Sequence, residues 1–258
     1  MTQTAPETFT TTLAAPPQPQ SRMSRAFQDR LNLVGAWTLT GWVLSLVIGW
    51  VLVAQLFPPP SPTTPQAELA REFTEHATRI QVGMAVIALA SPLYFVYGVV
   101  CASQVRRIEG GWGLLSLSVI CSTLTTSILA AVLPLFAATA AFRTERGPET
   151  IEAFSDLFWL GFIGLVGCVV AQALVLALAT FADRGPDPVF PRWFGYLNLW
   201  YALLGVPGAC VFFVHHGPLA WNGVVALWLP AAAAAAWFTG QQVVVLRALA
   251  QERESRRG

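Results

Sequence analysis

The stretch WGLLSLSVICSTLTTSILAAVLPLFAATAAF, residues 112–142, decides the fold of this chain. It contains no Asp, Glu, Arg, Lys or His over its whole length. An α-helix of about 20 apolar residues crosses the roughly 30 Å hydrocarbon core of a bilayer. The stretch therefore predicts a transmembrane helix.

The same pattern recurs along the chain. Ionisable residues are absent from six stretches, which are 35–57, 80–105, 112–142, 157–182, 193–214 and 217–246. Only 11% of the 258 residues are charged and 55% are hydrophobic, whereas soluble domains carry about 25% charged residues. We therefore predict an all-α, polytopic membrane protein with six transmembrane helices.

The remaining segments divide the chain into four parts. Residues 1–22 are rich in Thr, Pro and Ala without apolar periodicity, which predicts a disordered cytoplasmic tail. Residues 23–34 place apolar side chains at helical spacing, so we expect a short interfacial helix there. The transmembrane domain then spans 35–249, and 250–258 forms a cytoplasmic C-terminal tail.

The basic residues predict the orientation. All 15 are Arg, and with six crossings eleven of them lie on the side of the termini and four on the opposite side. Because short cytoplasmic segments carry an excess of basic residues, both termini should be cytoplasmic. The lysine-free composition, rich in Ala, Gly and Pro, is typical of GC-rich bacteria. We therefore expect a multi-pass protein of a bacterial plasma (inner) membrane.

The chemistry available at mid-membrane depth is limited. Ion-coupled transporters usually keep an ionisable group there, and haem ligation needs an axial His, but the six stretches contain neither. The four cysteines have neither disulfide nor zinc spacing, and we interpret them as small packing residues; they are Cys101, Cys121, Cys168 and Cys210. We therefore predict no cofactor, and the composition of the six stretches does not favour enzymatic activity.

Two amides supply polarity within the spans. Gln172 lies near the centre of the fourth stretch and Asn198 lies near the start of the fifth. They should either form interhelical hydrogen bonds or contact the polar end of a ligand. If they face the interior, hydroxyls of the third stretch such as Ser122 or Thr126 should be their partners. This hydroxyl-rich helix is also the one candidate for a polar pathway.

Other polar residues flank the spans. Arg192, Trp193 and Tyr196 are expected to anchor the fifth helix at the cytoplasmic interface, and Trp221 at the outer one. Asp156 directly precedes the fourth apolar stretch and is expected to be its N-terminal cap.

The outer side holds a weak metal-ligand pattern. Glu72 and His76 share a helical face, and His215 and His216 follow the fifth stretch. Together they provide the ligand types of a two-histidine-one-carboxylate site. Ring nitrogens must converge within a few ångströms to bind zinc, so we expect interfacial histidines and no metal site.

Several segments together resemble a family of uncharacterised bacterial six-span integral membrane proteins. They are EFTEHATRIQVGM (72–84), VRRIEGG (105–111), AAFRTERGPE (140–149), PVFPRWFGYLNLW (188–200) and GPLAWNGVVALWLP (217–230). The resemblance covers about residues 30–250. It implies the fold and the membrane location, and it brings no activity and no catalytic residues.

The sequence favours a non-catalytic protein, which is either an accessory protein or one that contacts lipophilic molecules. Its expected partners are membrane lipids, and either a membrane complex or further copies of the chain; a nucleic acid is not expected, because the net charge is only +1. A small-molecule transporter without a mid-membrane ionisable group and an outer-face metal-dependent enzyme are the alternatives.

Reporter fusions test the predicted orientation. A reporter fused after residue 65 should lie outside the cytoplasm, and one fused after residue 258 should lie inside it, because an odd number of crossings separates the two positions. Alkaline phosphatase and green fluorescent protein activities distinguish the two compartments. Cytoplasmic signals at both positions would contradict the six-span topology.

Overall fold

The computed structural model describes residues 23–143 and 145–256, and all regular structure in these two ranges is helical. The α-helices are α1 (Arg25–Leu46), α2 (Gln66–Glu75), α3 (Ala77–Ala90), α4 (Pro92–Glu109), α5 (Leu114–Phe142), α6 (Pro148–Gly164), α7 (Gly167–Ala182), α8 (Arg192–Gly205) and α9 (Leu229–Ser255). Four short segments of other helix types complete the regular structure of the described residues. They are the π-helices η1 (Val47–Val53) and η4 (Val224–Trp228), and the 3₁₀-helices η2 (Val206–Phe212) and η3 (Gly217–Leu219).

These elements combine into six helices that are long and apolar enough to cross a membrane, which confirms the predicted fold class. They are Arg25–Val53, Ala77–Glu109, Leu114–Phe142, Pro148–Ala182, Arg192–Phe212 and Gly217–Ser255. Helix α1 runs unbroken from Arg25 into the first span, so the helix expected over 23–34 is continuous with it. The tail expected over 1–22 lies outside the described residues.

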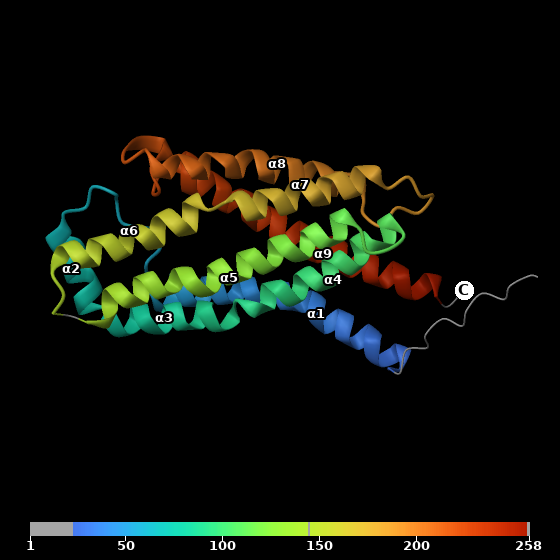
Figure 1. The fold of residues 1–258 in the computed structure, drawn as a ribbon, viewed down its shortest axis with the longest axis horizontal. Helices are drawn as coiled ribbons and strands as arrows, with labels where there is room; N and C mark the ends of the chain where they lie inside the picture. Colours follow the sequence, from blue (N-terminus) through green and yellow to red (C-terminus); the bar gives the residue numbers. More distant parts are fainter. Residues whose placement is uncertain (1–22, 144, 257–258) are drawn as a thin grey trace, which may run out of the picture.

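The helices form an elongated bundle with two distinct ends (Figure 1). The terminal end contains the start of α1, the end of α9, and the α4–α5 and α7–α8 connections. The loop end contains α2, the α5–α6 connection and η3. Helix α5 packs against α3, α4, α6 and α7, while α9 packs against α1 and α8. At the terminal end, Asp29 of α1 forms ion pairs with Arg253 and Arg256 of α9.

Four prolines lie within the charge-free stretches away from their ends, and three of them coincide with a break or a change of helix type. Pro92 begins α4 after a break at Ser91, Pro207 lies where α8 becomes 3₁₀-helical, and Pro230 lies where η4 becomes α9. Pro134, by contrast, lies within an uninterrupted α5. Proline removes a backbone donor and clashes with the preceding turn, and neighbouring helices can satisfy the freed carbonyl within a membrane.

The fourth span differs from its prediction in where it begins. Helix α6 starts at Pro148, well before the expected residue 157, so Asp156 lies inside the helix and the predicted N-terminal cap is wrong. The prediction placed the start after the acidic residues of 149–156. A helix that extends past the hydrocarbon can carry charge, so these residues do not mark its first residue. The break between α6 and α7 occurs at Leu165 and Val166, without a proline.

Small residues let the helices approach closely. A Cβ atom added to Gly49 would lie 2.6 Å from the Gly83 carbonyl oxygen, so η1 and α3 touch through their backbones. In the same way, a Cβ at Gly164 would lie 2.6 Å from Cζ of Phe212. Such contacts are typical of membrane helix interfaces, and Gly164 therefore lets the fourth span approach the fifth closely.

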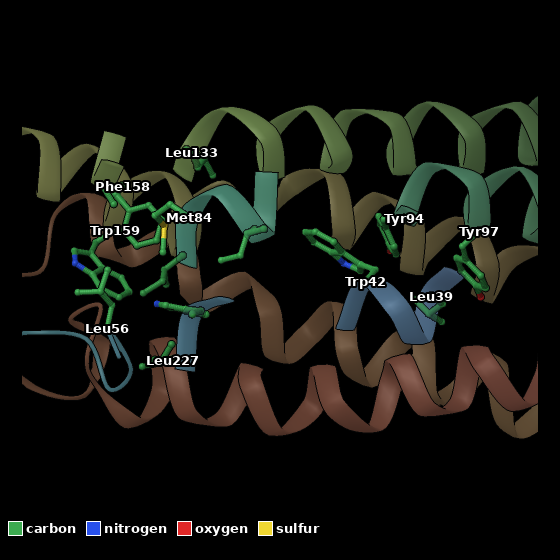
Figure 2. Packing of buried hydrophobic residues seen from close by; sticks show 14 of the residues in the cluster. Leu39, Trp42, Leu56, Met84, Tyr94, Tyr97, Leu133, Phe158, Trp159 and Leu227 are labelled. Atoms are coloured by element: carbon green, nitrogen blue, oxygen red, sulfur yellow. The ribbon is translucent and has the colours of Figure 1, made fainter. Parts of the chain in front are cut away.

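Aromatic side chains fill the core in two regions (Figure 2). Towards the loop end, Trp50 packs against Trp159 and Phe162, with ring centroids 5.6 and 4.3 Å apart. Further along the bundle, the ring centroids of Trp42 in α1 and Tyr94 in α4 lie 6.1 Å apart. Edge and offset contacts of this kind stabilise packed cores. The second region is the one that also contains polar side chains.

Candidate functional site

Four polar side chains meet in the bundle interior and join three helices. The Tyr94 hydroxyl of α4 donates a hydrogen bond to Oε1 of Gln172 in α7 (2.7 Å), and Gln172 Nε2 donates to Oε1 of Gln241 in α9 (3.2 Å). The Tyr97 hydroxyl donates to the same Gln241 oxygen (3.2 Å). All four residues are fully buried. We call Tyr94, Tyr97, Gln172 and Gln241 the amide–phenol network.

Local sequence places these groups together. Tyr94 and Tyr97 are three residues apart on α4, so they share a helical face, and their rings stack with centroids 6.2 Å apart. Gln172 follows the break between α6 and α7 by about one and a half turns. The interior is apolar around them, and a buried amide there is stable only when it is hydrogen-bonded.

Asn198 forms a second, separate polar contact. Trp237 Nε1 of α9 donates to its Oδ1 (2.8 Å), and Asn198 Nδ2 donates to the Phe194 carbonyl oxygen one turn earlier (2.7 Å). The Trp237 ring stacks on Tyr201, with centroids 4.1 Å apart and an interplanar angle of 9°. Asn198 thereby joins α8 to α9.

The prediction that Gln172 and Asn198 bond to hydroxyls of the third stretch is wrong. In α5, Ser122 donates to the Ser118 carbonyl oxygen (2.8 Å) and Thr126 to that of Ser122 (2.9 Å). Thr126 also lies 3.3 Å from the Cys168 sulfur of α7. A hydroxyl four residues after a carbonyl can bond back along its own helix. Ser122 and Thr126 bond in this way, and the partners of the amides are tyrosine, tryptophan and a second glutamine.

The chemistry of the amide–phenol network is that of neutral hydrogen bonds. It contains no carboxylate, imidazole or guanidinium group, so it offers no general acid or base with a pKa near neutrality. Within the described residues, Gln241 Nε2 and the Ser127 hydroxyl have no hydrogen-bond partner. The arrangement can hold helices together, and it retains one spare amide donor.

Sequence reasoning missed Tyr94, Tyr97, Gln241 and Trp237. A signal was present, because Gln241 is an amide within the charge-free stretch 217–246, as Gln172 is within 157–182. The partner of a polar residue in hydrocarbon is another polar residue. The pairing itself depends on which faces the bundle turns inward, and single-sequence patterns do not fix this.

The three histidines do not converge with Glu72. His215 and His216 line a shallow cavity of about 420 Å³ at the loop end with Ser61 and Asn222. His76 instead separates α2 from α3 and is absent from that lining. The described residues include no group of three or more His, Cys, Asp or Glu side chains arranged to hold a metal ion.

The predicted interfacial anchors fall into two kinds. Trp193 and Tyr196 are exposed at the terminal end, with 44% and 58% of their surfaces accessible, and Arg192 begins α8 beside them. Trp221 is buried, and its indole Nε1 donates to the Pro60 carbonyl oxygen (2.7 Å). Trp221 therefore fastens the first loop to the last span, whereas anchoring by the other three stays a prediction.

Comparisons with known protein families, with curated proteins and with solved structures give no match to this chain. No family is therefore identified, and the six apolar spans support a polytopic membrane protein without assigning it further.

A double-mutant cycle tests the amide–phenol network. Tyr94→Phe, Gln172→Leu and the double variant should show a coupling free energy of about 0.6 kcal/mol and at most about 1.7, which are values typical of hydrogen bonds between membrane helices. Unfolding in mixed micelles measures each variant. Tyr94→Phe combined with Asn198→Leu is the control, because these residues share no partner and should be additive within about 0.5 kcal/mol. Additivity in both pairs would contradict the network.

Proposed function

We propose that this chain is a non-catalytic accessory membrane protein that contacts lipophilic molecules through the outside of a closed bundle. The observation that carries the proposal is that Gln172 and Asn198 bond to side chains of other helices, while α5 hydroxyls such as Ser122 bond to carbonyls of their own helix. Gln172 and Asn198 then act in packing, because each is fully buried and bonded across helices.

The outward faces supply the contact surface. Large apolar side chains are exposed there on several spans, including Leu89 of α3, Phe142 of α5 and Leu203 of α8, with 82%, 69% and 62% of their surfaces accessible. In a bilayer these faces meet lipid tails or another apolar surface. Membrane lipids are therefore the first proposed partner, and a membrane complex or further copies of this chain are the next.

The proposed setting is a bacterial plasma membrane with both termini in the cytoplasm. The supporting features are the Arg asymmetry and the exposed Trp193 and Tyr196 at the terminal end, where aromatic residues favour the membrane interface. The resemblance to bacterial six-span proteins points the same way. A nucleic-acid partner is not proposed.

A transporter is the competing function, and one observation favours it. Gln241 Nε2 is a buried donor without a partner among the described residues, and a neutral solute passing the network would meet it. A pathway would also need the α5 hydroxyls, which instead donate to carbonyls of their own helix.

Liposome swelling distinguishes the two functions. Proteoliposomes containing the full chain should swell in glycerol, urea or erythritol no faster than protein-free liposomes. Gln172→Leu should leave this rate and the co-purified lipid unchanged, as should Gln66→Leu, an exposed control whose amide bonds Glu152 at the surface. Fast swelling that Gln172→Leu abolishes and Gln66→Leu preserves would replace the accessory function with transport.

A further inference from the structure

A groove opens at the terminal end of the bundle between α1, α4 and α9. It encloses about 540 Å³ and is lined by polar side chains including Gln28, Asn32, Ser103, Arg106 and Arg256. The α4–α5 connection, with Gly110, Gly111 and Trp112, also lines it. It lies apart from the amide–phenol network.

The cations lining the groove are unequally engaged. Arg107 donates to Gln104 Oε1 (2.7 Å) and to the Ala248 carbonyl oxygen (3.0 Å), and Arg256 pairs with Asp29 and Glu252. Arg106 makes no ion pair with any described residue, and its Cζ lies 5.2 Å from the centroid of the Trp112 ring. Three guanidinium groups and one carboxylate line the groove, so it favours an anion.

Neutral hydrogen-bond donors and an apolar surface adjoin Arg106. The side-chain amides of Gln28 and Asn32, one turn apart on α1, make no hydrogen bond to other described residues, and both line the groove. Val99 also lines it, and Val96 lies one turn earlier on α4; 38% and 41% of their surfaces are accessible. The polar groove therefore continues onto the outward face of a span, where acyl chains lie.

We propose that this groove binds the phosphate group of an anionic phospholipid, with Arg106 as its principal ligand. Guanidinium groups suit phosphate because their N–H donors match its oxygens. The Gln28 and Asn32 amides would donate to remaining headgroup oxygens, and Val99 and Val96 would contact the first carbons of an acyl chain. The inference rests on the proposed lipid contact and assigns it a headgroup class and a place.

Lipid titration of the detergent-solubilised full chain tests the proposal. The probes are dioctanoyl phosphatidylglycerol, dioctanoyl phosphatidylcholine and water-soluble glycerol 1-phosphate, and binding is followed by native mass spectrometry and thermal unfolding. Phosphatidylglycerol should bind more tightly than either of the other two. Arg106→Gln should weaken it roughly ten- to hundredfold, as expected for loss of a charge-assisted hydrogen bond. Arg184→Gln is the control, because it removes an exposed Arg that does not line the groove.

Each other outcome overturns a defined part of the inference. Equal binding of the two lipids, or equal losses in Arg106→Gln and Arg184→Gln, would remove the groove as a headgroup site while leaving general lipid contact intact. Equally tight, Arg106-dependent binding of glycerol 1-phosphate would make a soluble phosphate ester the ligand. Melting of each variant without lipid shows whether it is folded, and Arg106→Lys, which keeps the charge, should recover part of the affinity.

Discussion

The hydrogen bonds from Tyr94 to Gln172 and from Gln172 to Gln241 constrain the centre of this bundle. Hydrocarbon offers no water to a buried amide, so each polar side chain must find a partner on another helix or on its own backbone. These bonds form only when the faces of α4, α7 and α9 that carry the network turn inward together. Tight backbone contacts, such as Gly49 against Gly83, and aromatic packing around Trp50 are compatible with that one arrangement.

The same constraint separates the centre from the ends. Interior polar groups are neutral, whereas the ion pairs of the described residues lie at the two ends. Asp29 and Glu252 contact Arg253 and Arg256 at the terminal end, and Arg71 pairs with Glu75 on α2 at the loop end. Glu109 illustrates the transition, because its carboxylate accepts hydrogen bonds from the backbone N–H groups of Leu115 and Ser116 and so caps α5. Charged side chains that could contact a ligand therefore lie towards the ends of the bundle, as Arg106 does at the terminal end.

Sequence reasoning predicted the six spans because charge is expelled from hydrocarbon wherever a helix crosses it. It also identified Gln172 and Asn198 as the polar residues to watch, and both are buried. It missed their partners, because the inward face of α5 cannot be read from composition and its hydroxyls bond back along their own helix. The start of α6 was missed for a related reason, since acidic residues mark the edge of the hydrocarbon and not the end of the helix. The bond from the Trp221 indole to the Pro60 carbonyl oxygen could not be read from the sequence, because it joins segments 161 residues apart.

A closed bundle excludes water from the amide–phenol network, and the reactivity of the native Cys101 measures this exclusion most directly. This fully buried residue lies one turn after Tyr97 on α4. A variant that retains Cys101 as its single cysteine should resist a charged methanethiosulfonate reagent in membranes until it is unfolded. The matched variant, in which Cys101 is Ala and Ser103→Cys provides the single cysteine, should react readily because Ser103 lines the terminal groove. Comparable labelling of both cysteines in the folded protein would show that water reaches the network, and would contradict the closed bundle.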